Sequence, residues 1–388
     1  MDFAVDPADA RFRDDLRALL DGTLPDWWRG MFVDDPRAIP FTREFCRALA
    51  AREWLTLAWP AEHGGAGASA WTQAVLREEM WAAEEPRGPQ YMNLNYIGPL
   101  LMRYGTPTQR ARFLPPMARG EVIWCQGFSE PDAGSDLASL RTRARLVEDH
   151  FLVDGTKIWT SYADAPADWC LLLARSELAA DRHDGISVFL VDMTTPGISV
   201  RPIDTMAGPH EFNEVTFESV AVPRDCLLGE AGRGWELVAA GLTFERVGIA
   251  RYARAARVLE HLVTHANESG QSRDPRVRAR LAELRASCEA ARLLAYRAVS
   301  LQARGVVPTV EASIARIHAT RLEQEVGHAG LELLGPLGLL RSGDPVAPLA
   351  GEVQRHFVRN IPTTVAAGTL EIQKNIVARR GLGLPRET

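Results

Sequence analysis

Cysteine is scarce in this sequence, and its spacing excludes several kinds of site. The chain has five cysteines among 388 residues, an odd number with no Cys-x-x-Cys pair and no spacing typical of metal ligands. We therefore expect reduced thiols, no disulfide framework and no metal site. The five are Cys46, Cys125, Cys170, Cys226 and Cys288.

Long apolar runs and an excess of one charge are also missing. No apolar run approaches the roughly 20 residues that span a bilayer, and the opening MDFAVDPADARF has acidic residues and no apolar signal core. The formal net charge is −6, with both signs mixed along the chain. This excludes a basic face for nucleic acid and a polybasic membrane anchor. We expect a cytoplasmic protein with a small-molecule partner, and neither nucleic acid nor membrane.

The pattern of apolar residues changes twice along the chain. Three-to-four residue spacing in residues 1–121 predicts helices. Short β-branched and aromatic runs between Gly, Pro and Asp turns fill residues 122–233. Helical spacing then returns over 234–388. We predict an α+β fold with an N-terminal helical domain, a central β-domain and a C-terminal helical domain at these boundaries. The last part is expected to hold helices at about 234–265, 276–304, 309–334, 350–360 and 370–380.

One motif opens the predicted β-domain. The stretch WCQGFSEPDAGSDLASLRTRA runs from Trp124 to Ala144, and Pro131, Gly134 and Ser135 give it a turn-rich loop. Such a loop can present backbone N–H groups and hydroxyls to a phosphate or a polar cofactor edge. Taken alone, a loop of Gly and Ser is more often only a turn.

Three more stretches follow in a recognisable order. They are GTKIWTSYADAPADW from Gly155, EVTFESVAVPRDCLLGEAGRGW from Glu214 and AGTLEIQKNIVARRGLGLPR from Ala367. The first motif carries an SEP-x-AGSD signature, and the helical region before it contains WPAEHGGAGAS. With four ordered matches over residues 124–386, the chain resembles the acyl-CoA dehydrogenase family along almost its whole length. It is most similar to bacterial dicarboxylyl-CoA and steroid side-chain members.

This resemblance implies a reaction, a cofactor and partners. The reaction is the FAD-dependent oxidation of an acyl thioester, carried on CoA or an acyl carrier protein, to the trans-2-enoyl thioester. The electron acceptor would be a protein such as electron-transfer flavoprotein, and the assembly a homodimer or homotetramer. The cofactor contacts that the resemblance implies are Phe128 and Ser129 at the flavin ring, Gly134 and Ser135 on the pyrophosphate or substrate side, Trp159 over one flavin face, Ser161 near N5, and Thr369 at the phosphate or adenine end.

The family's usual base position is empty. Many members have a Glu directly before the Gly-Thr of the last motif, where this chain has Ala367, preceded by Ala366. In the branch of the isovaleryl-CoA and long-chain dehydrogenases the base precedes an Arg on the first C-terminal helix. Glu245 and Arg246 match that pattern, so the resemblance makes Glu245 the catalytic base. The backbone N–H of Ala367 needs no side chain and can still polarise the thioester oxygen.

The adenine end also departs from the family, and other functions stay open. The usual Arg-x-x-Phe-Gly pattern is absent from ANESGQSRDPRVRAR, in which Arg273 can replace its Arg. One alternative is a non-catalytic subunit of a heteromeric dehydrogenase, which Ala367 favours and Glu245 opposes. A flavin monooxygenase on the same fold would need no base at the α-carbon. An oxidase would differ in how well the folded site shields reduced flavin from oxygen.

Overall fold

The computed structural model describes residues 6–31, 35–164, 167–177, 182–239, 241 and 250–385, with backbone alone for 209–211. Contacts within the chain divide it into two compact units. The first unit comprises Met1–Gly22, Ser69–Glu84 and Arg246–Thr388, and the second comprises Thr23–Ala68 and Glu85–Glu245.

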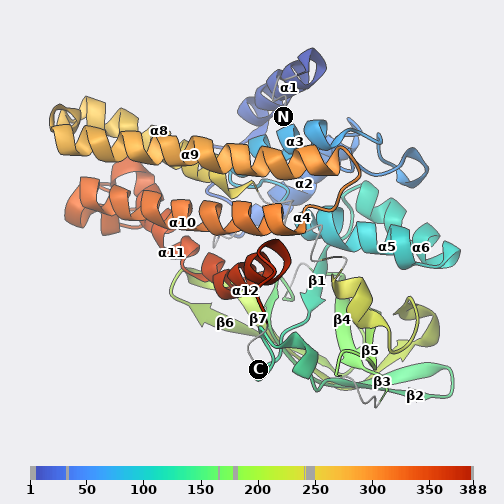
Figure 1. Ribbon diagram of the computed structural model, residues 1–388. Helices are drawn as coiled ribbons and strands as arrows, with labels where there is room; N and C mark the ends of the chain where they lie inside the picture. Colours follow the sequence, from blue (N-terminus) through green and yellow to red (C-terminus); the bar gives the residue numbers. More distant parts are fainter. Residues whose placement is uncertain are drawn as a thin grey trace. The chain divides into compact units, whose positions relative to one another are not determined.

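The first unit is helical. Figure 1 shows its two longest helices, α9 and α10, side by side, and the packing between them is the most extensive in this unit. Its helices are α1 (Pro7–Thr23), α3 (Ala70–Ala82), α8 (Arg251–Glu268), α9 (Pro275–Gln302), α10 (Thr309–Leu334), α11 (Glu352–Asn360) and α12 (Leu370–Ile376). Short helical turns join them at η5 (Gln271–Arg273), η6 (Gly335–Leu339), η7 (Pro348–Gly351), η8 (Pro362–Thr364) and η9 (Val377–Gly381).

Sequence signals account for these helices. On α8, Ala255, Leu259, Leu262 and Ala266 recur at three-to-four residue spacing, and all are buried. The Asp274 side chain accepts a hydrogen bond from the backbone N–H of Arg276 and caps α9, whose first residue is a proline. The helices expected at 276–304 and 309–334 are therefore observed with nearly the expected ends.

The helix expected at about 234–265 is not continuous, and that prediction was wrong. Ala250 has φ −86° and ψ 53°, outside the helical region, and α8 begins at Arg251. The apolar spacing continues across this point and no proline marks a break, so periodicity alone joins two segments that the backbone separates.

The second unit combines short helices with an eight-stranded sheet. The strand order is β6-β7-β3-β2-β4-β5-β8, with β1 pairing in parallel with β4. The strands are β1 (Trp124–Gly127), β2 (Arg143–Val147), β3 (His150–Ser161), β4 (Trp169–Arg175), β5 (Ile186–Asp192), β6 (Ile198–Thr205), β7 (Gly208–Pro223) and β8 (Leu227–Leu228). The helical elements are α2 (Ala38–Ala50), η1 (Ala61–His63), α4 (Gln90–Met92), η2 (Asn93–Ile97), α5 (Gly98–Tyr104), α6 (Pro107–Ala118), η3 (Leu137–Ser139) and η4 (Arg224–Cys226).

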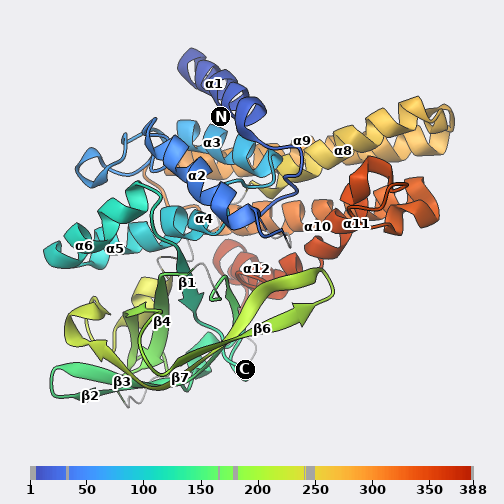
Figure 2. The ribbon, with the colours of Figure 1, turned by 180° about the vertical axis from the view of Figure 1, so that it is seen from behind.

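The apolar content of each strand matches its place in the sheet. The central strands β4 and β5 are buried at almost every position, as expected of strands covered on both faces. Edge strand β6 has no buried residue and forms, with β7, the long ribbon visible in Figure 2. The predicted α+β architecture of helices, sheet and helices is confirmed.

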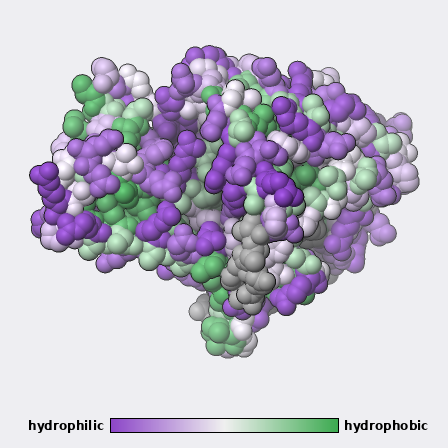
Figure 3. Space-filling model, turned by 90° about the horizontal axis from the view of Figure 1, so that it is seen from above, coloured by the Kyte–Doolittle hydropathy of each residue, from purple (hydrophilic) through white to green (hydrophobic). Residues whose placement is uncertain are grey.

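The surface is largely polar and the cysteines lie inside the protein. The face in Figure 3 is mostly hydrophilic, with apolar side chains in separate patches. Within the described residues, no helix is long and apolar enough to cross a membrane. All five cysteines are free and buried, and the part of the chain that was described holds no cluster of three potential metal ligands.

Candidate functional site

A buried ion pair holds the loop that follows β1. The Lys157 ammonium donates hydrogen bonds to Glu130 Oε1 at 2.8 Å and to the carbonyl of Phe128 at 3.1 Å. The Glu130 carboxylate also accepts from the backbone N–H groups of Arg141, at 2.6 Å, and Thr142, at 2.9 Å. The pair thus ties both ends of the signature loop to strand β3.

The pKa values of this pair follow from burial and mutual attraction. Burial alone would raise the pKa of Glu130, but the Lys157 charge and the hydrogen bonds outweigh it and lower that pKa. Burial lowers the pKa of Lys157 to about 8, with the Glu130 charge opposing it. Both groups are therefore charged near neutral pH.

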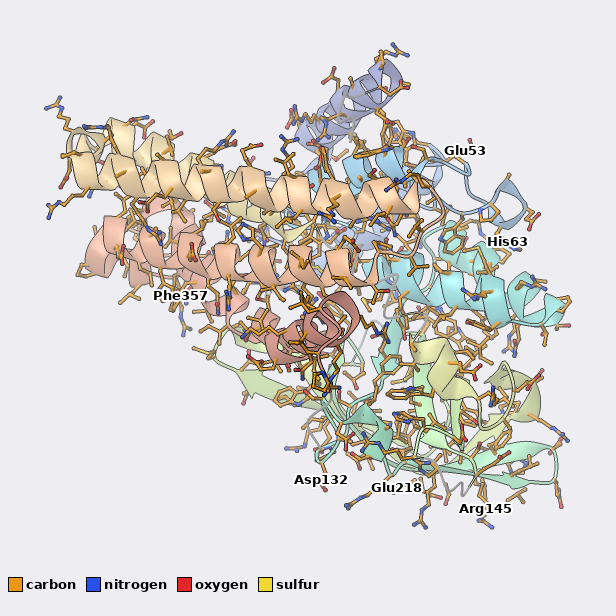
Figure 4. The ribbon with its side chains drawn as sticks, viewed as in Figure 1. Glu53, His63, Asp132, Arg145, Glu218 and Phe357 are labelled. Atoms are coloured by element: carbon orange, nitrogen blue, oxygen red, sulfur yellow. The ribbon has the colours of Figure 1, made fainter. Side chains whose placement is uncertain are left out.

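The tip of the signature loop is open to solvent. Glu130 and Ala133 exchange backbone hydrogen bonds of 3.0 Å across the turn, and Asp132 lies at the outer end of this unit in Figure 4. Gly134 and Ser135 are exposed. A Cβ built on Gly134 meets no atom within 4 Å. The fold itself does not need a glycine there, so the open space is available to a ligand.

Trp159 occupies a strained and exposed position in β3. Its φ is 60°, a left-handed value that is rare for a bulky residue. The pairing of β3 with β7 is irregular between Lys157 and Thr160, and this irregularity turns the Trp159 ring outward, with 55% of the residue exposed. One ring edge packs against Phe212, 6.1 Å away between centroids. Strain at an exposed aromatic residue points to a functional surface.

The backbone brings Ser129 beside the strand that carries Trp159. The carbonyl of Ser129 accepts a 2.9 Å hydrogen bond from the N–H of Ile158, and Ser161 ends β3. Among the described residues, the hydroxyls of Ser129, Ser135 and Ser161 make no hydrogen bond. These hydroxyls are available to a polar cofactor edge.

Phe128 is held from the helical side of the same unit. Its ring meets the ring of Tyr96 edge-on at 5.9 Å, and Tyr96 is fully buried. A Cβ on Gly241 would lie 2.6 Å from the Tyr96 ring. Only glycine fits at this close approach, so Gly241 lies directly against the ring that packs on Phe128.

In the first unit, the predicted donor Ala367 lies in a tight loop before α12. Ala367 has φ 54° and Gly368 has φ 88°. The Thr369 hydroxyl accepts a 3.1 Å hydrogen bond from the N–H of Ile372 and caps α12. Among the described residues, the N–H of Ala367 has no backbone partner.

Two buried arginines bind this loop from the side of α8 and α10. Arg316 of α10 donates to the carbonyl of Ala366, and Arg251 of α8 donates to the carbonyl of Thr363 at 3.2 Å. Sequence reasoning missed both residues, as it missed the Glu130–Lys157 pair. A lysine at the start of the β-branched and aromatic run KIWTSY was a signal for that pair. An arginine in a helix gives no sign of a partner that lies 50 residues away, as for Arg316, or 112 residues away, as for Arg251.

Two further predicted site residues are Arg273 and Glu245. Arg273 ends the turn η5 and is exposed. Glu245 lies outside the described residues.

The residues of the second unit fit a flavin cofactor. An exposed, strained indole and the hydroxyls of Ser129 and Ser161 lie on adjoining backbone, and the loop that begins at Ser129 continues to the open position at Gly134. A planar ring system with polar edges needs such an apolar wall and such donors.

Family models match all three parts of the chain. The acyl-CoA dehydrogenase N-terminal domain matches residues 6–121, the middle domain 125–220 and the C-terminal domain 232–382. Acyl-CoA dehydrogenase IpdE1 of Mycobacterium tuberculosis is 34% identical over 386 residues, which cover 96% of this chain and 98% of that protein. Human mitochondrial short-chain specific acyl-CoA dehydrogenase is 30% identical, covering 82% of this chain and 77% of its own.

Solved structures give the same answer. The Tcur3481-Tcur3483 steroid ACAD superposes with a TM-score of 0.91 at 32% identity, and the ChsE4-ChsE5 complex from Mycobacterium tuberculosis with 0.89 at 33%; each match covers 100% of both chains. Fold and sequence together define a flavin-dependent oxidoreductase. The chain belongs to the acyl-CoA dehydrogenase family. The predicted family, fold and enzyme class are confirmed, and the substrate class is an acyl thioester.

Proposed function

We propose that this chain oxidises a saturated acyl-CoA to its trans-2-enoyl thioester, with FAD held at Phe128, Ser129, Trp159 and Ser161. The observation that carries the proposal is the outward-facing Trp159 ring at φ 60°, beside the strand-end hydroxyls. Gly134 and Ser135 would serve the pyrophosphate side. Thr369 and Arg273 would serve the phosphate and adenine end, on the strength of the resemblance.

The chain's own groups would supply proton removal and charge stabilisation. When bound, FAD supplies the acceptor for the β-hydrogen, which leaves as a hydride. Glu245 takes the α-proton, and a carboxylate that has lost its hydration is a stronger base. The Ala367 N–H donates to the thioester oxygen as negative charge develops there.

The packing of Gly241 supports the assignment of Glu245. Gly241 lies against Tyr96, which in turn packs on Phe128. Four residues of chain lead from Gly241 to Glu245 and extend at most about 14 Å. This chain length is compatible with a base that acts near a residue assigned to the flavin ring.

We also propose a bulky acyl chain, of the steroid-derived or dicarboxylyl kind. Similarity to a steroid ACAD over the full length supports this. So does the pair Ala366 and Ala367, which carry a methyl group each where many relatives have Tyr and Glu. Small side chains leave room for a branched or cyclic group near the reacting carbons.

A heteromeric assembly is the second candidate. It is supported by similarity to the ChsE4-ChsE5 complex and by the absence of an acid at 367. In that case a partner chain would complete the site. The electron acceptor in either case would be a protein such as electron-transfer flavoprotein.

Anaerobic flavin bleaching tests the proposal. The purified chain, loaded with FAD, is mixed with a panel of acyl-CoAs from short and unbranched to steroid-derived. We expect loss of the oxidised flavin absorbance with at least one bulky acyl-CoA and an enoyl-CoA product by mass. A yellow protein that no acyl-CoA bleaches, alone or with a co-expressed homologue, would contradict the proposal.

A further inference from the structure

The structure assigns a positioning role to Arg316: it aims and strengthens the N–H of Ala367 by binding the opposite end of the same peptide group. This inference rests on the proposed function, because it concerns the donor to the thioester oxygen. Arg316 lies on α10 and is 6% exposed. Its guanidinium donates a hydrogen bond to the carbonyl oxygen of Ala366.

The geometry follows from the planar peptide bond. The carbonyl of Ala366 and the N–H of Ala367 belong to one peptide group, and the described backbone contains no cis peptide. In a trans peptide the C=O and N–H bonds point in opposite directions. A cation fixed on the oxygen therefore turns the N–H away from α10. Ala367 is in the left-handed region, at φ 54°, which is unfavourable for a non-glycine residue, so the loop needs an external contact to hold this orientation.

The hydrogen bond also changes the strength of the donor. A charged donor on the carbonyl draws electron density through the conjugated peptide group, so the N–H becomes a better donor. Arg316 lies in a small cavity of about 40 Å³, where eight alanines, Val299 and Tyr252 form most of the wall and Arg77 and Arg251 are the other charged groups. Charges act more strongly where little water screens them.

Arg251 provides a matched comparison in the same cavity. It is 7% exposed, lines the same space and donates to the carbonyl of Thr363 in the same loop. The N–H of that peptide belongs to Thr364 and already donates to the carbonyl of Ile361 at 3.3 Å. Arg251 therefore supports the loop without presenting a free N–H.

The test compares R316K, R316Q and R316M with R251M in the FAD-loaded protein. One readout is the rate of anaerobic flavin reduction by the acyl-CoA that bleaches the wild type best. The other is the pH at which bound acetoacetyl-CoA ionises to its enolate, followed by its absorbance, because the enolate oxygen takes the same donor. Removing an oxyanion donor costs about 10² to 10³ in rate; for a donor that is only misaligned we expect about 10- to 100-fold in R316M.

We expect enolate formation to move to higher pH in the order R316K, R316Q, R316M, and to stay near the wild-type pH in R251M. If R316M does not fold, the difference between R316Q and R316K in the pH of enolate formation tests the inference. Equal enolate formation in the Arg316 variants, or equal losses in R316Q and R251M, would overturn the inference. A wild type that reduces its flavin but binds no enolate would also overturn it. If no acyl-CoA bleaches the wild type, the proposed function itself fails and takes the inference with it.

Discussion

At the scale of single residues, two glycines of the second unit meet opposite demands. Gly134 has open space where a side chain would be, whereas a Cβ on Gly155 would lie 2.5 Å from the Thr142 hydroxyl, at φ 152°. The fold therefore tolerates a side chain at position 134 but requires glycine at position 155.

G134A should therefore leave the fold intact and weaken the binding of FAD. We expect the free energy of unfolding without FAD to change by less than about 0.5 kcal/mol, and FAD to bind roughly tenfold more weakly, about 1.4 kcal/mol. Thermal melts and flavin fluorescence titrations measure the two effects. G155A is the control and should destabilise the protein without FAD as well. Unchanged FAD affinity in G134A would remove this loop from the cofactor site.

E245Q tests the base directly. The amide keeps the size of the side chain but does not accept the α-proton, so anaerobic flavin reduction should slow by about 10² to 10⁴-fold. FAD binding and the melting temperature should stay near wild type. Adding A367E should restore part of the rate for unbranched acyl chains, since many relatives carry their base there. Reduction of E245Q at the wild-type rate would show that Glu245 is not the base.

At the scale of helices and strands, the sequence predicted features that depend on local pattern but missed those that depend on distant contacts. The helices α9 and α10 and the apolar strands β4 and β5 follow from periodicity and caps that act within a few residues. The motif order singled out Ser129 and Trp159 as expected cofactor contacts, which stay predictions. It did not reveal the strand irregularity that exposes the Trp159 ring, because strand register depends on a partner about 50 residues away.

An ion pair between α8 and α11 should make part of the stability depend on pH. His261 Nδ1 lies 2.6 Å from the Glu352 carboxylate, and this hydrogen bond raises the pKa of His261 above 6.5, with burial opposing it. A raised pKa in the folded state means that the stabilisation is complete below pH 6.5 and is lost as pH rises through the raised value. The side chain is 40% exposed, so we expect no more than about 1 kcal/mol.

Denaturant midpoints between pH 5.5 and 9 measure this effect. H261Q should flatten the fall in stability over this range, and E352Q should flatten it equally because it removes the other partner. The two single variants and the double variant should then show the same dependence of the denaturant midpoint on pH. A pH dependence unchanged in H261Q would assign it to other groups.

At the scale of the whole molecule, exposed apolar residues support the proposal that the chain assembles with a partner. Between α10 and α11, Leu337, Leu339 and Val346 are 50%, 62% and 66% exposed. Apolar groups gathered on a surface commonly mark an interface, and family resemblance implies a closed symmetric oligomer.

We expect the FAD-loaded chain to sediment as a dimer or tetramer, and L339D/V346D to shift it toward smaller species. V307D, at another exposed position of the same unit, 65% exposed, serves as the control. A fully active monomer would contradict the homomeric prediction. An inactive single chain that gains activity and mass with a co-expressed homologue would favour the heteromeric candidate.

The buried thiols can report on local unfolding of the protein. Cys288 belongs to the first unit, and the other four cysteines belong to the second. Burial raises the pKa of the Cys226 thiol to about 11 and that of the Cys288 thiol to about 11. Alkylating reagents therefore react with these thiols only after local or global unfolding exposes them. Peptide mapping after a timed pulse of iodoacetamide would therefore date the exposure of each unit separately, without adding any probe to the chain.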